Sequence, residues 1–526
     1  MEISFFGATQ MVTGSCYLIT LNKTKILVDC GMFQGNKKVR NLNYVDFPFN
    51  PKEIDYLLLT HAHIDHSGRI PGLFKNGFKG VIICNNATYD LCDIMLHDSA
   101  HIQEVELEWK NRKRKRRGQL LLEPLYTHSD VEECMKLFKT LNYDEMFKMN
   151  DNIKIMYRNS GHMLGSAIIE IWVNENSKEK KYVFTGDLGN FDQPLLKDPQ
   201  IIKSTDYLIM ESTYGDRLHS INDDMEDELL KIIIDTAKKG GNIIIPSFAI
   251  GRTQEVLYQL NKYKENGSLG KYDKIPVYVD SPLAIKATEV FKKNYCLYDK
   301  EAKELLDNGD DPLVFHNLNF TITADESKSI NSIVGSKIII ASSGMCDAGR
   351  IRHHLKHNIW KKNSALVFVG YQAKDTLGYN ILNGIKSVRL FGEDIQVNAS
   401  IHKLNDYSSH ADLNGLLNWI ENMDELPRKI VLIHGDKEAM NNLKNRIIQR
   451  FNSKVIIPSL GDKINLSNEE EFIESIDIDI NDNGEKNILK ELKKLSNRFE
   501  NISLNSEEID KIQYNIQIIS NIIKGK

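Results

Sequence analysis

A dense cluster of metal-binding side chains stands near the beginning of the chain. Residues 61–66 read His-Ala-His-Ile-Asp-His and directly follow the apolar run Tyr56 to Thr60. Imidazole nitrogens and carboxylate oxygens together suit a borderline-soft divalent ion such as zinc. A buried strand that ends in such a loop delivers its ligands to one place. We therefore predict half of a two-metal site here.

Three further ligand candidates follow apolar strands at points where the chain turns. They are His162 in Ser-Gly-His-Met-Leu-Gly, Asp187 in Thr-Gly-Asp-Leu-Gly and His434 in Leu-Ile-His-Gly-Asp. The glycines beside them allow tight turns, which let several loops approach one ion. Asp29, at the end of an early strand, is expected to orient a ligating histidine rather than to bind the metal itself.

The composition is that of an ordinary soluble globular protein with room for two or more domains. The 526 residues are 41% hydrophobic and 26% charged, and the net charge of −5 indicates no general affinity for nucleic acid. We expect neither a secretory signal nor a membrane helix, because no suitable apolar stretch is present. The seven cysteines are scattered without Cys-x-x-Cys spacing, which favours a cytoplasmic protein without a disulfide framework.

One local basic run departs from this acidic balance. Residues 110–117 read Lys-Asn-Arg-Lys-Arg-Lys-Arg-Arg and continue a segment, Leu91 to Trp109, that is predicted to be helical. A solvated helix end is the commoner explanation of such a run, and a patch that contacts RNA is the alternative.

The order of the predicted elements indicates one domain inserted into another. The first 200 residues are rich in short strands, among them a hairpin around Asn22 and Lys23. From 226 to about 369 strands alternate with helices, which is typical of a parallel α/β unit. From about 395 the first pattern returns, with a strand at Lys429 to Ile433 and helices at 413–422 and 437–450.

The end of the chain has a different character. An acidic, loop-like stretch runs from Glu469 to Glu485, and two sets of apolar residues at helical spacing follow it, from Ile488 to Ile502 and from Ile509 to Ile523. We expect a helical hairpin that packs on the body of the protein or on a second subunit. A homodimer is therefore one possible assembly.

Taken in order, these motifs resemble the metallo-β-lactamase fold, and later motifs are similar to those of its β-CASP nucleases. The later motifs are Met210-Glu-Ser-Thr-Tyr-Gly215, Pro246-Ser-Phe-Ala-Ile-Gly-Arg252, Ser342-Ser-Gly-Met345, Ser408-Ser-His-Ala-Asp412 and Leu432-Ile-His-Gly-Asp436. The resemblance covers about residues 1–460. Within this family the chain is most similar to bacterial relatives of the pre-mRNA 3′-end cleavage endonuclease, which have an RNA-specificity region.

The resemblance implies an α/β fold, namely an αββα sandwich with an inserted α/β domain and a C-terminal helical extension. The expected domains are residues 1–205 and 394–463 for the two parts of the metallo-β-lactamase domain and 206–393 for the inserted β-CASP domain. Residues 464–526 are expected to form the acidic linker and the helical hairpin.

The resemblance also implies a set of ligands for two zinc ions per chain. His61, His63 and His162 would hold one ion, Asp65, His66 and His434 would hold the other, and Asp187 would bridge them. Water between two cations loses a proton more easily, so the pair would supply a hydroxide that attacks phosphorus. Asp65 would also orient this hydroxide.

The remaining catalytic task is proton donation to the departing ribose oxygen. His410 is the candidate general acid, and Glu211 would hold and polarise it. Backbone amides at Ser343 and Gly344 and the guanidinium of Arg252 are candidate phosphate contacts. The expected substrate is single-stranded RNA. Internal cleavage is expected, and cleavage from a 5′ end is the alternative.

Two other functions compete with this one. A hydrolase of small esters or thioesters has the same fold, but its last metal histidine normally follows the bridging aspartate closely. The only such candidate is His219, whereas His434 lies beyond a long insertion. A non-catalytic RNA-binding subunit is expected to lose ligands, and this chain keeps all seven. DNA stays open as a substrate because no residue can be identified as a reader of the 2′-hydroxyl.

Overall fold

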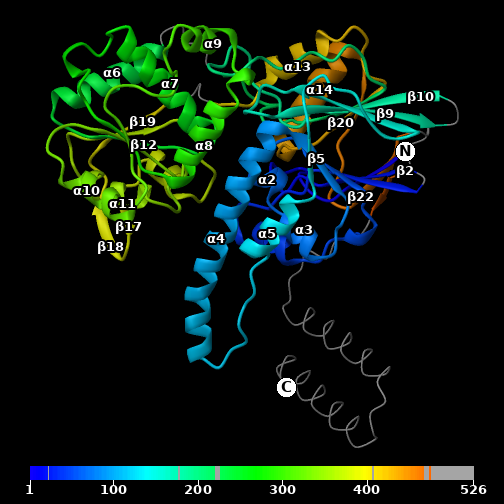
Figure 1. Cartoon of the computed structure of the whole chain (residues 1–526), viewed down its shortest axis with the longest axis horizontal. Helices are drawn as coiled ribbons and strands as arrows, with labels where there is room; N and C mark the ends of the chain where they lie inside the picture. The colour runs from blue at the N-terminus through cyan, green and yellow to red at the C-terminus, as the bar shows by residue number, and fades with distance from the viewer. Residues whose placement is uncertain (22, 176–177, 220–224, 405–407, 467–472, 476–526) are drawn as a thin grey trace, which may run out of the picture.

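The computed structural model describes residues 1–21, 23–175, 178–219, 225–404, 408–466 and 473–475. Two large β-sheets pack face to face, and a third sheet with its own helices lies beside them (Figure 1). The helical hairpin predicted from residue 488 onward lies outside the described residues.

The first sheet has eight strands in the order β23-β22-β1-β2-β3-β4-β5-β6. The predicted hairpin is formed by β2 and β3, which are antiparallel neighbours. The sequence predicted a loop in the stretch that contains β23. A strand forms there because it pairs with β22 at the edge of the sheet. The strands are β1 (Glu2–Phe5), β2 (Tyr17–Leu21), β3 (Thr24–Val28), β4 (Tyr56–Leu58), β5 (Val81–Asn85), β6 (Phe138–Leu141), β22 (Asp462–Asn465) and β23 (Ile473–Ser475).

The second sheet has seven strands in the order β21-β20-β11-β10-β9-β8-β7. In β8 the buried residues Ile153, Ile155 and Tyr157 alternate with more exposed ones, as expected of a strand with one buried face. The strands are β7 (Phe147–Asn150), β8 (Ile153–Asn159), β9 (Ala167–Glu175), β10 (Lys178–Phe184), β11 (Tyr207–Met210), β20 (Lys429–Leu432) and β21 (Lys454–Ile456).

An apolar core fills the space between these sheets. Side chains such as Ile19 and Val28 from the first sheet meet Ile169 and Phe184 from the second. Helices cover the two outer faces, which gives four layers in the order αββα (Figure 1). They are α2 (Ile64–Ser67), α3 (Ile70–Lys75), α4 (Asn86–Arg116) and α5 (His128–Met135) on the first sheet and α13 (Leu413–Glu421) and α14 (Lys437–Phe451) on the second.

A few short helical segments lie outside these layers. They are α1 (Lys37–Asn41) and the 3₁₀ turns η1 (Leu42–Tyr44), η2 (Pro51–Glu53), η3 (Gly270–Tyr272), η4 (Tyr295–Leu297) and η5 (Ile330–Ser332). Within the described part of the chain, no helix combines the length and the apolar character needed to cross a membrane.

The third sheet is fully parallel and has the order β14-β13-β15-β12-β16-β19. Its central strand contains the buried run Ile243-Ile244-Ile245, as expected where helices cover both faces. The strands are β12 (Ile243–Pro246), β13 (Val277–Val279), β14 (Leu318–Phe320), β15 (Ile338–Ala341), β16 (Ala365–Phe368) and β19 (Ser400–Lys403), with a separate hairpin of β17 (Ser387–Leu390) and β18 (Glu393–Gln396).

The helices of this third unit follow the predicted alternation with its strands. They are α6 (Met225–Lys238), α7 (Arg252–Glu265), α8 (Pro282–Lys293), α9 (Lys300–Asp307), α10 (Ala324–Ser329), α11 (Ile351–Asn358) and α12 (Leu377–Leu382). β19 pairs with β16, so by its hydrogen bonds the inserted sheet continues to residue 403, beyond the boundary at 393 expected from the sequence.

The inserted unit contacts the sandwich at several places. The chain leaves the second sheet after β11 and returns to it at β20, and these two strands are parallel neighbours. Elsewhere α8 packs on α4, where Lys293 and Asn294 both contact the carboxylate of Asp90, at 2.8 and 3.0 Å. The insertion is therefore held on the sandwich by more than its connecting segments.

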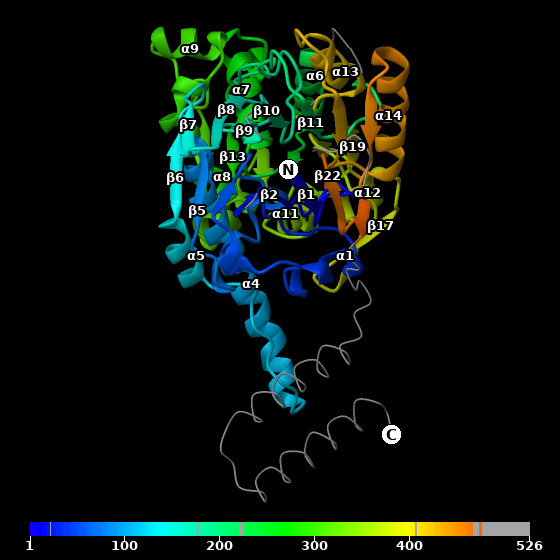
Figure 2. The same cartoon turned by 90° about the vertical axis from the view of Figure 1, so that its right-hand side faces the viewer.

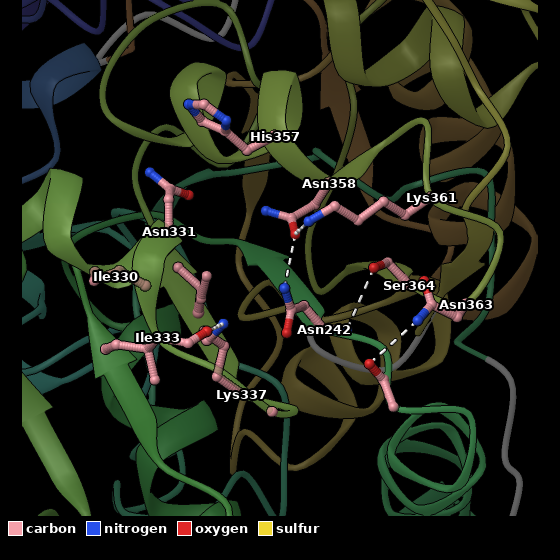
Figure 3. A pocket seen from close by; sticks show the side chains of 13 residues that line it. Asn242, Ile330, Asn331, Ile333, Lys337, His357, Asn358, Lys361, Asn363 and Ser364 are labelled. Carbon is pink, nitrogen blue, oxygen red and sulfur yellow. Dashed lines mark hydrogen bonds between the residues drawn. The ribbon is translucent and has the colours of Figure 1, made fainter.

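A polar cavity of about 250 Å³ lies at the amino ends of the parallel strands (Figure 3). Its lining residues Asn242, Lys337 and Ser364 directly precede β12, β15 and β16. The Nζ of Lys337 donates to the carbonyl oxygen of Ile333 at 2.7 Å, so this buried ammonium is satisfied within the chain. The histidine cluster lies elsewhere, as described next.

Candidate metal centre

The candidate ligands all lie just after the carboxyl ends of strands of the sandwich. Asp29 follows β3, the His61–His66 motif follows β4, and His162 follows β8. Asp187 follows β10, and His434 follows β20. The two sheets therefore present loops from one edge toward a single place, and all of these side chains except Asp65 and His63 are almost fully buried.

His61, His63, His162 and Asp187 form the first group. The Nε2 atoms of His61 and His162 lie 3.2 and 3.1 Å from Nδ1 of His63. Asp187 Oδ2 lies 3.5 Å from His61 Nε2 and 3.6 Å from His162 Nε2. Nitrogen ligands about 2.0 Å from a tetrahedral zinc are about 3.3 Å apart, so these atoms have the spacing of a coordination sphere.

Asp65, His66 and His434 form the second group. His434 Nε2 lies 3.2 Å from His66 Nε2 and 3.5 Å from Asp65 Oδ2. The other oxygen of Asp187, Oδ1, lies 3.4 Å from His66 Nε2 and 3.4 Å from His434 Nδ1. One carboxylate thus reaches both groups, with one oxygen on each side.

Hydrogen bonds to outer residues determine which nitrogen faces inward in His61, His66 and His162. The Thr60 hydroxyl donates to Asp29 at 2.9 Å, so it must accept the Nδ1 proton of His61 at 3.1 Å. His66 Nδ1 donates to Asp29 at 2.8 Å, and His162 Nδ1 donates to the carbonyl of Ser409 at 3.3 Å. In each ring the Nε2 lone pair is left to point into the cluster, as in zinc sites.

The electrostatics favour neutral imidazoles at His61, His63 and His162 around an ionised Asp187. Burial lowers the pKa of His61 and His162 well below the usual value and that of His63 to about 4. Burial alone raises the pKa of Asp187, but the neighbouring histidines lower it well below its usual value. Burial also lowers the pKa of His66, but the charges of Asp187 and Asp29 raise it, so a cation at its Nε2 would displace a proton.

Two observations show that these residues fit a metal ion. Asp187 Oδ1 is buried and accepts no hydrogen bond from the described residues, although buried carboxylate oxygens normally have partners. Imidazole nitrogens that face one another with lone pairs repel, unless a cation lies between them. The donor set of nitrogen and oxygen atoms is the one that zinc accepts. The cluster is therefore compatible with metal binding.

His410 and Glu211 lie together at the rim of the cluster. His410 Nδ1 is 3.2 Å from Glu211 Oε1, and His410 Nε2 is 3.9 Å from Asp187 Oδ2. Burial lowers the pKa of His410, but the charges of Glu211, Asp187 and Asp65 raise it to about 9. Glu211 is fully buried and also accepts the backbone N–H groups of Leu188 and Thr213. The side chain of His410 is 19% exposed, which leaves it accessible to solvent.

The local sequence explains how His410 is presented. Asp412 caps α13, as the sequence predicted, by accepting the N–H of Gly415 at 2.8 Å. The same carboxylate accepts the N–H of His219 at 2.9 Å, and the ring of His219 lies 2.9 Å from the carbonyl oxygen of His410. His219, the metal candidate under the small-ester hypothesis, therefore supports the His410 loop instead of joining the cluster.

The three expected phosphate contacts lie in the inserted unit. Arg252 is buried at the start of α7 and pairs with Glu255. Ser343 and Gly344 follow β15 at the carboxyl edge of the parallel sheet, and the carbonyl of Gly344 accepts a hydrogen bond from Gln372 at 2.9 Å.

Two threonines were missed by the sequence analysis. Thr60 connects Asp29 to His61, and Thr213 places its hydroxyl 3.1 Å from His434 Nδ1. Thr60 directly precedes His61, and Thr213 lies in the motif of residues 210–215. A hydroxyl close to a candidate site residue was the sequence signal that could have identified them. The hydrogen bonds themselves depend on tertiary contacts that spacing does not reveal.

Comparisons with known proteins agree with this architecture. The model of the metallo-beta-lactamase superfamily matches residues 11–131, the Beta-Casp domain matches 253–381, and the Zn-dependent metallo-hydrolase RNA specificity domain matches 394–458. The three matches fall on the first part of the sandwich, on the inserted unit and on the returning part. They define a metallo-hydrolase of the metallo-β-lactamase fold.

Curated relatives extend over nearly the whole described chain. Ribonuclease TTHA0252 of Thermus thermophilus is 35% identical over 440 residues, which cover 84% of this chain and 94% of that protein. The RNase J-like protein of Methanocaldococcus jannaschii is 31% identical over 87% of this chain and 98% of that protein. Transcription termination factor FttA of Methanococcus maripaludis is 30% identical over 89% of this chain and 72% of that protein.

The chain therefore belongs to the β-CASP ribonuclease family of zinc-dependent metallo-hydrolases. The predicted family and the predicted fold class are both confirmed.

Removal of Asp187 should empty the cluster. In Asp187→Ala both groups lose their shared carboxylate, and the inward-facing imidazoles lose the negative charge between them. We expect the zinc content of the purified protein, measured by plasma mass spectrometry, to fall from the parental value to near zero. The exposed Asp151→Ala is the control and should keep the parental zinc content. An unchanged zinc content in Asp187→Ala would contradict the central position of this carboxylate.

A single methyl group at Gly31 should disturb the loop that carries Asp65 and His66. A Cβ added to Gly31 would lie 1.6 Å from the carbonyl oxygen of Asp65, so the loop must move. We expect Gly31→Ala to lower zinc content and the melting temperature. At Gly72, in α3, the nearest atom to an added Cβ is 3.9 Å away, so Gly72→Ala should keep both. Equal behaviour of the two variants would show that the close approach does not matter.

Proposed function

We propose that this chain is a ribonuclease that hydrolyses phosphodiester bonds of single-stranded RNA with two zinc ions. His61, His63 and His162 would hold one ion, Asp65, His66 and His434 the other, and Asp187 both. The observation that supports this most is the inward direction of the Nε2 lone pairs, which outer hydrogen bonds impose on His61, His66 and His162. Two bound cations would supply Lewis acidity and a nucleophile at neutral pH.

The chain's own side chains would perform the rest of the reaction. The side chain of Asp65 is 20% exposed at the second group, so this carboxylate would orient the attacking water. His410 would give its Nε2 proton to the departing ribose oxygen, since this atom is close to Asp187 and the ring is partly exposed. Glu211 keeps the Nδ1 side of the ring occupied and favours the protonated form.

RNA as the substrate is supported by the family of the returning segment and by the position of the insertion. The RNA specificity domain matches residues 394–458, which include His410 and His434. Burial raises the pKa of Tyr371, which lies just after β16. The charges of Arg217 and Asp436 also influence this pKa. The carboxyl edge of the inserted sheet, where Tyr371 lies, is therefore within electrostatic range of the loops after β11 and β20.

Phosphate contacts would come from this same edge. The backbone at Ser343 and Gly344 follows β15 and is the better candidate. Arg252 is buried against Glu255, so it would reach a phosphate only by leaving that partner. The guanidinium is thus the less favoured of the predicted contacts.

His410→Ala should separate chemistry from metal binding. The ring lies outside both ligand groups, so zinc content should stay at the parental value while the cleavage rate of a single-stranded RNA falls by about 10²–10⁴-fold. His101→Ala, an exposed histidine on α4, is the control and should cleave at the parental rate. Parental cleavage by His410→Ala would rule out the general-acid role, whereas loss of zinc would assign the histidine to the metal.

RNAs labelled at either end should distinguish internal cleavage from degradation at a 5′ end. For an endonuclease, which we expect, both labels appear in fragments of intermediate length from the earliest times. Release of labelled mononucleotides from the 5′ end would show an exonuclease. A matched DNA oligonucleotide tests whether the 2′-hydroxyl is required, and failure to cleave either nucleic acid in the zinc-loaded protein would overturn the proposal.

A further inference from the structure

The polar cavity at the amino ends of the parallel strands is lined by basic side chains (Figure 3). Lys337 is almost fully buried, Lys361 is half-buried and His357 is exposed, so these side chains extend from the interior of the cavity to its rim. Among the described residues that line the cavity there is no Asp or Glu. This local character contrasts with the net charge of −5 of the whole chain.

The two lysines of the cavity have neutral partners. Nζ of Lys337 donates to the carbonyl oxygen of Ile333 at 2.7 Å, and Nζ of Lys361 lies 3.4 Å from the side-chain oxygen of Asn358. Neither ammonium group forms an ion pair within the part of the chain that the structure describes. Burial lowers the pKa of Lys337, and the charge of Lys361 lowers it further. An anion in the cavity would offset this repulsion.

The hydroxyl group of Ser364 adds a buried donor. Ser364 is 1% exposed, and its Oγ accepts the backbone N–H of Asn242 at 3.3 Å. Its own proton has no acceptor among the described residues. An ammonium group has three protons, and the bond from Lys337 to Ile333 uses one of them. The cavity therefore offers donors and no ionised acceptor, which suits a ligand that consists of acceptor oxygens.

The size of the cavity favours a small ligand. Its volume of about 250 Å³ lies below the range of about 300–1,000 Å³ that is usual for pockets of drug-sized molecules. A terminal phosphate carries a charge of about −1.5 to −2 at pH 7 and has three strong acceptor oxygens. Two ammonium groups and a hydroxyl match this charge and these oxygens. A carboxylate, with one charge and two oxygens, matches them less well.

The cavity and the expected phosphate contacts lie at opposite ends of the same strands. β12, β15 and β16 have four residues each, so their two ends are about 13 Å apart. Lys337 directly precedes β15, whereas Ser343 and Gly344 follow it. The inserted unit, which contains the cavity, lies beside the sandwich in Figure 1 and behind it in the view of Figure 2. The cavity is therefore separate from the metal cluster.

We propose that this cavity binds the phosphate group of a small molecule, with a 5′-mononucleotide and free phosphate as the two sources of that group. Lys337 and Lys361 neutralise the phosphate, Ser364 donates its hydroxyl proton to it, and His357 lies at the rim. The proposal does not depend on the ribonuclease activity, because none of these residues belongs to the metal cluster.

Binding is tested by isothermal titration of the zinc-loaded full chain with adenosine 5′-monophosphate and with inorganic phosphate. Lys361→Met should weaken binding by about 10-fold or more, because a charged donor is lost. Lys361→Arg keeps the charge and should bind nearly as well as the parental protein. The matched control is Lys362→Met, which changes the adjacent exposed lysine outside the cavity and should leave binding unchanged.

The buried ammonium group is tested by thermal unfolding. Phosphate should raise the melting temperature of the parental protein, since a ligand that binds only the folded chain stabilises it. Potassium chloride at the same ionic strength should not reproduce this rise. In Lys337→Met the rise with phosphate should be largely lost, whatever the melting temperature of this variant without phosphate.

The source of the phosphate group follows from a comparison of ligands. Tighter binding of adenosine 5′-monophosphate than of inorganic phosphate would support a mononucleotide, and equal binding would support free phosphate. Adenosine, which lacks the phosphate, should not bind in either case.

Four outcomes would overturn the proposal. One is that neither phosphate compound binds at millimolar concentration. Another is binding that Lys361→Met and Lys337→Met both leave unchanged, which would place the ligand at another site such as the metal cluster. The third is equal binding of adenosine and adenosine 5′-monophosphate. The last is displacement of the bound phosphate by a single-stranded RNA with hydroxyl groups at both ends, which would make the cavity a contact for the RNA backbone.

Discussion

The rest of the structure depends on one carboxylate that lies between two groups of imidazoles. Asp187 has one oxygen within 3.6 Å of His61 and His162 and the other within 3.4 Å of His66 and His434. These rings come from loops of both sheets. The edge of the sandwich at which these loops meet is therefore built around a buried negative charge. An ionised carboxylate with an unpartnered oxygen is costly inside a protein unless a cation balances it. The buried carboxylate that is costly for the fold is also the group that the proposed chemistry requires.

The position of the insertion follows from the order of the strands. β11 and β20 are parallel neighbours, with Met210 opposite Leu432, although more than 200 residues separate them along the chain. Parallel neighbours need a crossover, and here the crossover is the whole inserted unit together with α13. Glu211 therefore directly follows β11, where the chain leaves the sheet, and His434 follows β20, where the chain returns. These two strand ends are adjacent. His410, on the way back, meets Glu211 because both belong to this one junction.

The sequence indicated which side chains gather in the cluster better than it indicated their surroundings. The cluster from His61 to His66 and the strand-end positions of His162, Asp187 and His434 were visible because apolar runs typical of strands end at those points. The strands and helices of the inserted unit were also found, since a parallel sheet alternates with its helices. The roles of Thr60 and Thr213 were not found, and neither was the pairing of β19 with β16, because each depends on contacts between segments distant in sequence. The ion pair between Arg252 and Glu255 is local in sequence, at i and i+3. The spacing alone does not reveal that both side chains are buried.

Metal binding and the connection between the two domains are physically coupled. The loops after β4 and β8 meet the loops after β10 and β20 at the cluster, and β20 is the strand at which the chain returns from the insertion. Anything that binds the folded cluster and not the unfolded chain stabilises the folded state by mass action. Bound cations would therefore fasten His434, and with it the returning strand, to the first half of the sandwich. Because the His410 loop also rests on His162, through the carbonyl of Ser409, the same fastening would position the proposed proton donor beside the cluster.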